Sequence, residues 1–356
     1  MPGGLANVVA IYALTSAGAS VARRLAAALP GSSLFLPARL ARGDEQTFSR
    51  LAEALGKNFR SFPAHVAVAA SGIVVRAIAP LLVHKAEDPA VVVVDQRGLF
   101  AVSLVSGHLG GANDLARRAA AILGGQPVIT TGSDVEGLPS LELEASRAGL
   151  RWDSLDALSR VASALLEGEP VEVHDPQGWL LPGLDRRWPG LFLARQELPG
   201  ALEAGPPLVL VTHRTLDPRP GWLLLRPSCL CLGLGCNRGT TAEEMHELLE
   251  RVFSERGLAG TAIFCLASVE AKRDEPGLIE LSRRLGADLI FYPSDRLETV
   301  AVPNPSSLVQ QHMGTRSVCE AAAILAARGG PLIVGKSKST NATLAVALKG
   351  PAAASG

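Results

Sequence analysis

The sequence predicts a multidomain α/β protein, with N-terminal and C-terminal α/β domains of mixed strands and helices joined by a smaller α+β middle region. At both ends of the chain, short apolar runs of β type alternate with segments of helical period. At about 150 residues per domain, 356 residues are enough for two or three domains. We expect an N-terminal domain at 1–150, a middle domain or bridge at 151–228 and a C-terminal domain at 229–350.

The N-terminal domain is predicted from an ordered series of strands and helices. A helix running from Ser16 to Leu29 is indicated by Val21, Leu25 and Leu29, which lie four residues apart on one face. Asp95–Gly98 has the chemistry of a hairpin turn between two apolar runs. The strands expected here are Asn7–Leu14, Ser33–Leu36, His65–Ala70, Ala90–Val94, Leu99–Val105 and Pro127–Thr131.

The middle region differs in composition, because it holds all four Trp and many Pro-Gly pairs. We expect one amphipathic helix there, Ser154–Glu167, and short strands at Val171–His174, Leu191–Ala194, Leu208–Thr212 and Trp222–Leu225. The α/β pattern returns with the expected strands Leu230–Leu234, Thr261–Ala267, Asp288–Tyr292 and Leu332–Val334, and helices near Leu278–Leu285 and Val318–Ala327.

Composition excludes several classes of protein. With 34 basic and 34 acidic residues the net charge is zero, which argues against a nucleic-acid partner or a polybasic membrane binder. Hydrophobic residues make up 47% and charged residues 19%, which excludes a disordered chain. No apolar run approaches the roughly 18 residues that span a bilayer, so no membrane partner is expected.

The five Cys predict neither disulfides nor a metal centre. Their number is odd and their spacing wide, so they do not form a disulfide framework. Cys229, Cys231 and Cys236 lack the further ligands of a zinc site, and small buried thiols are the favoured interpretation. We therefore expect a cytoplasmic protein without a bound metal.

The densest chemical signal is the string SGHLGGAND at 106–114, where a strand gives way to a helix. Glycines let a ligand approach the backbone closely, and a helix start offers free N–H donors to an anion. His108 can exchange a proton near neutral pH. A tight surface turn explains the same string about equally well. Ser106 lacks the G-x-S-x-G frame of a nucleophile elbow, so a Ser–His–Asp triad gains little support.

Other candidate residues can bind anions. Arg76 and Lys85 follow the turn Ser71-Gly72, although solvated surface charge is the commoner role for such residues. Gly235, Asn237, Arg238 and Gly239 form a glycine turn before a helix, whose spacing is one residue too long for a dinucleotide fingerprint. A helix-entry turn is the equal alternative.

Two further patterns have plain alternatives. Gly330–Ser337 matches the P-loop pattern, but Pro331–Val334 is expected to be the strand itself, so we reject a nucleotide site. Lys336 and Lys338 can still bind anions as point charges. Glu275 lies in a charged loop, where a solvated cluster is the default and a carboxylate base the alternative.

Several of these strings, taken in order, resemble the cobalt-precorrin-5A hydrolase (CbiG) family of anaerobic cobalamin biosynthesis. The strings are SGIVVRAIAPLL (71–82), Lys85 with DPAVVVVD (88–95), SLVSGHLGGAN (103–113), GLGCNRGT (233–240), KRDEPGL (272–278), GTRSVCEAAA (314–323) and KSK (336–338). They run from the N-terminal to the C-terminal domain, and the middle region adds little.

The resemblance implies a reaction and a substrate. The substrate is a cobalt-bearing tetrapyrrole with many carboxylates and a δ-lactone at ring A. Water opens the lactone, a two-carbon fragment leaves as acetaldehyde, and cobalt-precorrin-5B remains. Cobalt arrives with the substrate, so no cofactor is expected. Neighbouring enzymes of the pathway are further expected partners. The alternative function is a non-catalytic carrier of the same tetrapyrrole.

Roles follow for the candidate residues. We expect His108 to act as base, with N–H groups around Gly107–Gly111 stabilising the oxyanion. Asn113 would orient lactone or water, and Glu275 would serve a second proton transfer. Ligation of the cobalt is an alternative role for His108. The expected substrate-binding residues are Ser71, Gly72, Arg76, Lys85, Ser106, Gly107, Gly110, Gly111, Gly235, Asn237, Arg238, Gly239, Lys336 and Lys338.

Overall fold

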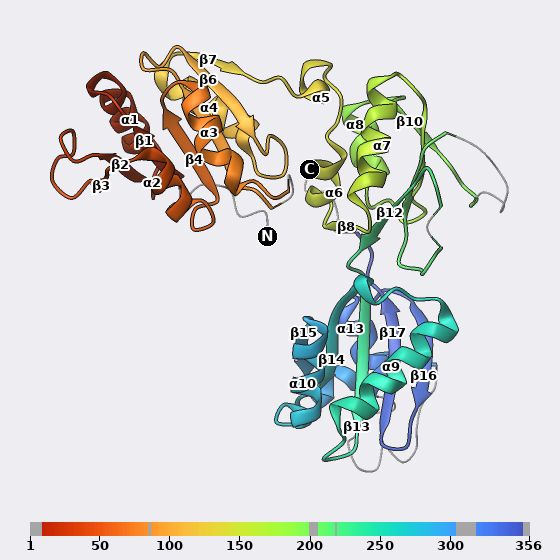
Figure 1. Cartoon of the computed structure of the whole chain (residues 1–356). Helices are drawn as coiled ribbons and strands as arrows, with labels where there is room; N and C mark the ends of the chain where they lie inside the picture. Colours follow the sequence, from red (N-terminus) through yellow and green to blue (C-terminus); the bar gives the residue numbers. More distant parts are fainter. Residues whose placement is uncertain (1–8, 85–86, 199–205, 218, 304–317, 352–356) are drawn as a thin grey trace. The chain divides into compact units, whose positions relative to one another are not determined.

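The computed structural model describes residues 9–84, 87–198, 206–217, 219–303 and 318–351, which form two compact units, 1–143 and 144–356 (Figure 1). Unit 1 holds a seven-stranded sheet of order β3-β2-β1-β4-β5-β6-β7. Its strands are β1 (Val9–Ala13), β2 (Ser33–Pro37), β3 (Gln46–Phe48), β4 (Ala64–Val68), β5 (Ala90–Val94), β6 (Phe100–Val105) and β7 (Gln126–Val128). Neighbouring strands are parallel except β5 and β6, which form the predicted hairpin.

Helices cover both faces of this sheet. They are α1 (Ser16–Ala28) and α4 (Ala112–Leu123) on one face, and α2 (Leu51–Asn58) and α3 (Ser71–Ile78) on the other. A 3-10 turn, Ala79–Leu81, follows α3, and the single turn α5 (Gly132–Val135) follows β7. α6 (Leu141–Arg147) begins in unit 1. Pro80 lies in the 3-10 turn after α3, as its fixed φ and missing N–H predict.

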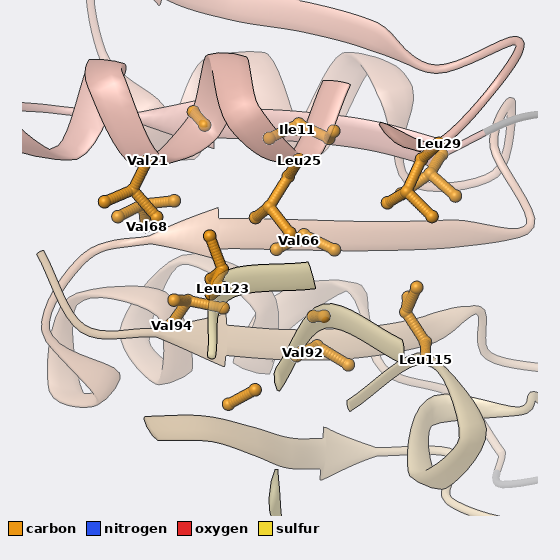
Figure 2. Close-up of a cluster of buried hydrophobic side chains, with 14 of the residues drawn as sticks. Ile11, Val21, Leu25, Leu29, Val66, Val68, Val92, Val94, Leu115 and Leu123 are labelled. Atoms are coloured by element: carbon orange, nitrogen blue, oxygen red, sulfur yellow. The ribbon is translucent and has the colours of Figure 1, made fainter. Parts of the chain in front are cut away.

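Alternate strand residues face opposite helix layers. Figure 2 shows Leu25 of α1 and Leu115 of α4 among Ile11, Val66 and Val92 on one face. Their neighbours in sequence, such as Tyr12, Ala67 and Val91, pack with α2 and α3 on the other face. Because both faces are covered, the central strands are apolar throughout, with five consecutive buried residues in each of β1, β4 and β5.

Unit 2 contains two further sheets. The middle sheet has the order β10-β9-β11-β12-β8 and is parallel except for β8. It comprises β8 (Leu150–Trp152), β9 (Val171–His174), β10 (Phe192–Ala194), β11 (Leu208–Val211) and β12 (Trp222–Pro227), with α7 (Leu155–Leu166) and α8 (Leu181–Arg187). The helix and strands predicted for this region are therefore present.

The third sheet has the order β15-β14-β13-β17-β16. Its strands are β13 (Leu230–Cys236), β14 (Ile263–Val269), β15 (Asp288–Tyr292), β16 (Leu332–Lys338) and β17 (Ala342–Leu348). The helices are α9 (Ala242–Arg256), α10 (Pro276–Leu285), α11 (Ser294–Glu298) and α13 (Val318–Ala326), with 3-10 turns at Gly260–Ala262 and Glu270–Lys272. The three sheets with their helices confirm the α/β prediction.

One expected strand, Asn7–Leu14, begins outside the described residues, and another needs a correction. The strand predicted at Pro127–Thr131 ends at Val128, and Thr131 is instead the N-cap residue of α5. Leu332–Lys338 is a strand, as the rejection of a P-loop required. Four of the Cys are buried and Cys236 is partly buried. Within the described residues, no helix is both long and apolar enough to cross a membrane.

Candidate active site

The strand order explains why two loops of unit 1 meet. β6 and β7 are parallel neighbours, paired from Phe100 with Gln126 to Val102 with Val128. Loops that leave the carboxyl ends of parallel neighbours emerge at the same edge of a sheet. The glycine-rich segment after β6 therefore lies beside the segment after β7, which carries Thr131, Ser133 and Asp134.

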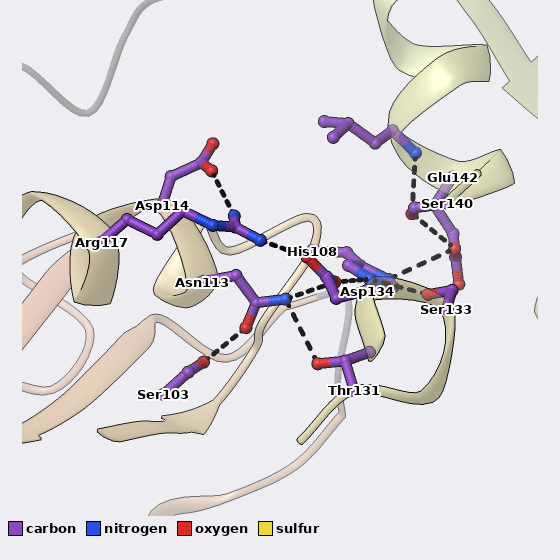
Figure 3. Close-up of polar contacts among 11 residues, drawn as sticks. Ser103, His108, Asn113, Asp114, Arg117, Thr131, Ser133, Asp134, Ser140 and Glu142 are labelled. Atoms are coloured by element: carbon purple, nitrogen blue, oxygen red, sulfur yellow. Dashed lines mark hydrogen bonds and ion pairs between the residues drawn. The ribbon is translucent and has the colours of Figure 1, made fainter. Parts of the chain in front are cut away.

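His108 is the centre of a polar cluster at this edge (Figure 3). Its Nε2 lies 2.9 Å from Oδ2 of Asp134 and 3.3 Å from Oγ of Ser133, and its Nδ1 lies 3.8 Å from Oε2 of Glu142. An ionised carboxylate accepts hydrogen bonds only, so the short contact to Asp134 assigns the imidazole proton to Nε2. Nδ1 is then the nitrogen with a lone pair, and it can take a proton from a bound water.

Asp134 holds this cluster together. Besides His108, its carboxylate accepts hydrogen bonds from Nδ2 of Asn113 at 2.8 Å and from the Arg117 guanidinium at 2.5 Å. Partial burial opposes ionisation, but the hydrogen bonds from Arg117 and His108 and the positive charge of Arg117 outweigh it and hold the pKa of Asp134 below its ordinary value. Asp134 is thus a fixed negative charge that orients the imidazole.

Asn113 is a positioning residue in this geometry. Its Oδ1 accepts a 2.6 Å hydrogen bond from the Ser103 hydroxyl, and its Nδ2 donates to Asp134 and, at 3.2 Å, to Thr131. The side chain is 3% exposed. A Cβ on Gly107 would lie 2.7 Å from Oδ1 of Asn113, which explains the glycine there. We expected Asn113 to orient the lactone or water, whereas its amide atoms are bound within the protein.

The glycine loop leaves several donors unpaired. Gly111, Ala112 and Asn113 donate their N–H groups to carbonyls within 106–108. The N–H groups of residues 107–110 have no acceptor among the residues that the structure describes. Ser106 has a left-handed backbone, with φ of 59°, and its buried Oγ has no hydrogen-bond partner there. Unpaired donors beside a histidine suit a ligand oxygen that gains negative charge.

A hollow of 410 Å³ opens beside this loop. Its lining includes Leu109 and Gly110, together with the apolar side chains of Phe62, Pro63 and Pro89. Arg60 also lines it, fixed by a 3.0 Å ion pair with the buried Asp88. The hollow therefore has an apolar wall and an acidic part, Glu87 and Asp88, next to the glycine loop.

The predicted residues Ser71, Gly72 and Arg76 lie elsewhere in unit 1. They belong to α3, which follows the carboxyl end of β4. Because β6 runs antiparallel to β5, which in turn is parallel to β4, the loop of His108 emerges at the opposite edge of the sheet. The structure does not bring these three residues together with His108. Lys85 lies outside the described residues.

The remaining predicted residues gather in unit 2, at one edge of the third sheet. Asn237 donates its backbone N–H to Asn341 at 2.8 Å, and Arg238 forms an exposed 3.3 Å pair with Asp274. Gly235, Gly239 and Lys338 belong to the same edge, because β13 and β16 both end there. The backbone N–H of Lys336 donates to the buried carboxylate of Glu320 at 2.9 Å, which ties α13 to β16.

Glu275 is held inside this edge. Its Oε1 accepts the Gly239 N–H at 2.6 Å, and its Oε2 lies 3.6 Å from Nζ of Lys272. The residue is 2% exposed. In this conformation Glu275 orders the glycine turn and presents little carboxyl surface to a ligand. Its expected role in proton transfer stays a prediction.

Sequence reasoning missed Ser133, Asp134 and Glu142. A carboxylate after a strand is a usable signal, but we extended the strand to Thr131 and did not weigh the residues that follow. No spacing in the sequence links them to His108. No set of three or more His, Cys, Asp or Glu in the described part of the chain is placed to hold a metal ion.

Comparison with known proteins gives the family. Family models match three consecutive segments: cobalamin synthesis G N-terminal at 53–134, the cobalamin biosynthesis central region at 139–227 and cobalamin synthesis G C-terminus at 230–347. A cobalt-precorrin-5A hydrolase of Priestia megaterium is 34% identical over 358 residues, which is 95% of this chain and 94% of the relative. One of Salmonella typhimurium is 32% identical over 90% of this chain and 92% of the relative.

A solved structure adds a partial likeness. The crystal structure of CobE, a protein from the cobalamin (vitamin B12) biosynthetic pathway, is 35% identical and covers 35% of this chain and 92% of its own. Its TM-score is 0.33.

These findings define an α/β enzyme of the hydrolase class that acts in cobalamin biosynthesis. The chain belongs to the CbiG family. The family and the enzyme class predicted from the motifs are therefore confirmed.

Proposed function

We propose that this chain hydrolyses the ring A δ-lactone of cobalt-precorrin-5A and releases the two-carbon fragment as acetaldehyde, leaving cobalt-precorrin-5B. Two relatives that match most of the chain carry the name cobalt-precorrin-5A hydrolase. The structural observation that carries the proposal is the Asp134–His108 pair beside the backbone N–H groups of residues 107–110, which have no acceptor in the described part of the chain.

The first step is attack by water on the lactone carbonyl. Nδ1 of His108 accepts a proton from the water, while Asp134 holds Nε2–H and stabilises the imidazolium that forms. N–H groups of residues 107–110 stabilise the tetrahedral oxyanion. The ring C–O bond then breaks, and the imidazolium returns its proton to the leaving oxygen. The products are a carboxylic acid and a hydroxyl on the two-carbon bridge.

The second step breaks a carbon–carbon bond, as in a retro-aldol reaction. The hydroxyl loses its proton, acetaldehyde leaves, and the electron pair passes to the tetrapyrrole, which is protonated. Cobalt enters with the substrate. The hollow beside Leu109 supports the proposal, because its apolar wall suits the hydrocarbon edge of a macrocycle.

The test is acetaldehyde release from cobalt-precorrin-5A by the purified full chain. We expect His108→Ala to lower this rate about 1000-fold, within the usual range for loss of a general base. His246→Ala is the matched control, because His246 lies on α9 and pairs with Glu250 at 3.9 Å. Near-normal turnover by His108→Ala would remove His108 from the mechanism. Tetrapyrrole binding without acetaldehyde release by the natural chain would support the carrier alternative.

A further inference from the structure

His108 is flanked by two carboxyl groups, one at each ring nitrogen. Asp134 at Nε2 also receives Arg117 and Asn113, so its negative charge is fixed. Glu142 faces Nδ1 at 3.8 Å, and its Oε2 accepts a 3.1 Å hydrogen bond from the Ser140 hydroxyl (Figure 3). Glu142 is thus the carboxyl group on the side of the imidazole that exchanges a proton.

The proposed reaction has a second proton transfer that a group of this kind can serve. His108 takes one proton from water and returns it to the leaving oxygen, so its part in lactone opening is complete before the carbon–carbon bond breaks. Carbon–carbon cleavage then requires removal of the hydroxyl proton and protonation of the tetrapyrrole. Asp134 is unsuited, because Arg117 and Asn113 occupy its oxygens. Glu275 is unsuited, because its oxygens face Gly239 and Lys272.

We propose that Glu142 is the second acid–base group of the reaction and acts in the carbon–carbon cleavage step. This inference rests on the proposed function. The Glu142 carboxylate removes the hydroxyl proton as the carbon–carbon bond breaks and the carbonyl of acetaldehyde forms. The electron pair of that bond goes to the tetrapyrrole, which takes the same proton from the Glu142 carboxyl. Atoms and charge balance, and no oxidant or reductant is consumed.

The short separation of Glu142 from Nδ1 places both proton transfers at one site. His108 has returned its proton to the leaving oxygen when the lactone is open, and the Glu142 carboxylate 3.8 Å from Nδ1 then serves as the base for the next step. Water attack and bond cleavage can therefore use one position of the substrate, with His108 serving the first step and Glu142 the second.

The experiment follows the two steps separately, because the lactone and the ring-opened hydroxy acid differ in mass. The full chain and its Glu142→Gln variant are mixed with cobalt-precorrin-5A, and the lactone, the ring-opened hydroxy acid and acetaldehyde are measured over time. In Glu142→Gln we expect lactone opening within about threefold of the natural rate and acetaldehyde release about 100-fold slower, so that the hydroxy acid accumulates. Glu142→Asp should restore part of the release. Glu136→Gln, which removes an exposed carboxylate at the end of α5, is the matched control.

Two results would overturn the assignment. One is acetaldehyde release at the natural rate in Glu142→Gln. The other is an equal loss of both steps in folded Glu142→Gln and Glu142→Asp, which would indicate a role in positioning His108. If Glu142→Gln fails to fold, accumulation of the hydroxy acid is measured in Glu142→Asp. No accumulation of the hydroxy acid in Glu142→Asp would then overturn the assignment. A natural chain that releases no acetaldehyde would instead refute the proposed function itself.

Discussion

Two glycine turns of this protein give similar signals in the sequence and have different structures. The turn at 106–111 in unit 1 leaves the N–H groups of residues 107–110 without an acceptor among the described residues and places His108 beside Asp134. In the turn at 235–240 in unit 2, two backbone N–H groups are bound by other residues of the same chain. Glu275 accepts from Gly239, and Asn341 accepts from Asn237.

The glycines in the first turn and just before the second turn also have different structural roles. A Cβ on Gly233, just before the second turn, would lie 1.8 Å from the carbonyl oxygen of Cys319, so glycine is needed there for α13 to pack on β13. In the first turn Gly107 makes room for the side chain of Asn113, which supports Asp134. A glycine turn before a helix therefore indicates that another group approaches the backbone closely, and that group is sometimes part of the same chain.

The largest expected effect tests the first turn. Asp134→Asn should lower kcat for acetaldehyde release by about 100-fold or more with a small change in KM, because an amide cannot stabilise the imidazolium. Steady-state kinetics on cobalt-precorrin-5A provides the measurement. Asp114→Asn is the control, because Asp114 is an exposed partner of the same Arg117. A loss confined to KM would contradict the role assigned to Asp134.

The strand that leads into the second turn, β13, should respond in stability. Gly233→Ala should lower the free energy of unfolding by about 3 kcal/mol, because its methyl group meets the backbone of α13. Gly260→Ala is a suitable control, since a Cβ there has no neighbour within 4 Å. Denaturant unfolding of both variants measures the difference. Equal stability of the two would show that α13 does not need glycine at 233.

The smallest effect concerns a second histidine of unit 1, His65. Burial lowers the pKa of His65 to about 4, because the ring lies in the core between Tyr12 and Phe59. The unfolded chain binds the proton more readily, so stability is complete above the unfolded value of about 6.5 and falls towards pH 4, by at most about 1.4 kcal/mol per pH unit. Hydrogen exchange in β4 between pH 7 and pH 4.5 measures this slope. His65→Phe should flatten it, and an unchanged slope would assign the loss to other groups.

The sequence alone determined the local elements and much of the chemistry. Apolar runs such as Ala90–Val94 and the helical spacing of Val21, Leu25 and Leu29 depend on short-range periodicity, so they were predictable. The hairpin at Asp95–Gly98 followed from its turn residues. The string at 106–113 singled out His108, because a titratable side chain among glycines is a local feature.

The tertiary structure decided which residues share a site. Asp134 reaches His108 because β7 lies parallel to β6, and strand order is set by packing over the whole sheet. Glu142 comes to His108 from α6, further along the chain. The antiparallel turn into β6 sends His108 to the edge opposite Ser71, which no spacing in the sequence reveals. The burial of Glu275 was also decided by the tertiary structure. A solvated charged loop and a buried ion pair have the same local composition, so the sequence could not distinguish them. The periodicity that predicts a helix or strand can be seen within a few residues. The proximity of site residues depends on contacts between distant segments, which form only when the chain folds.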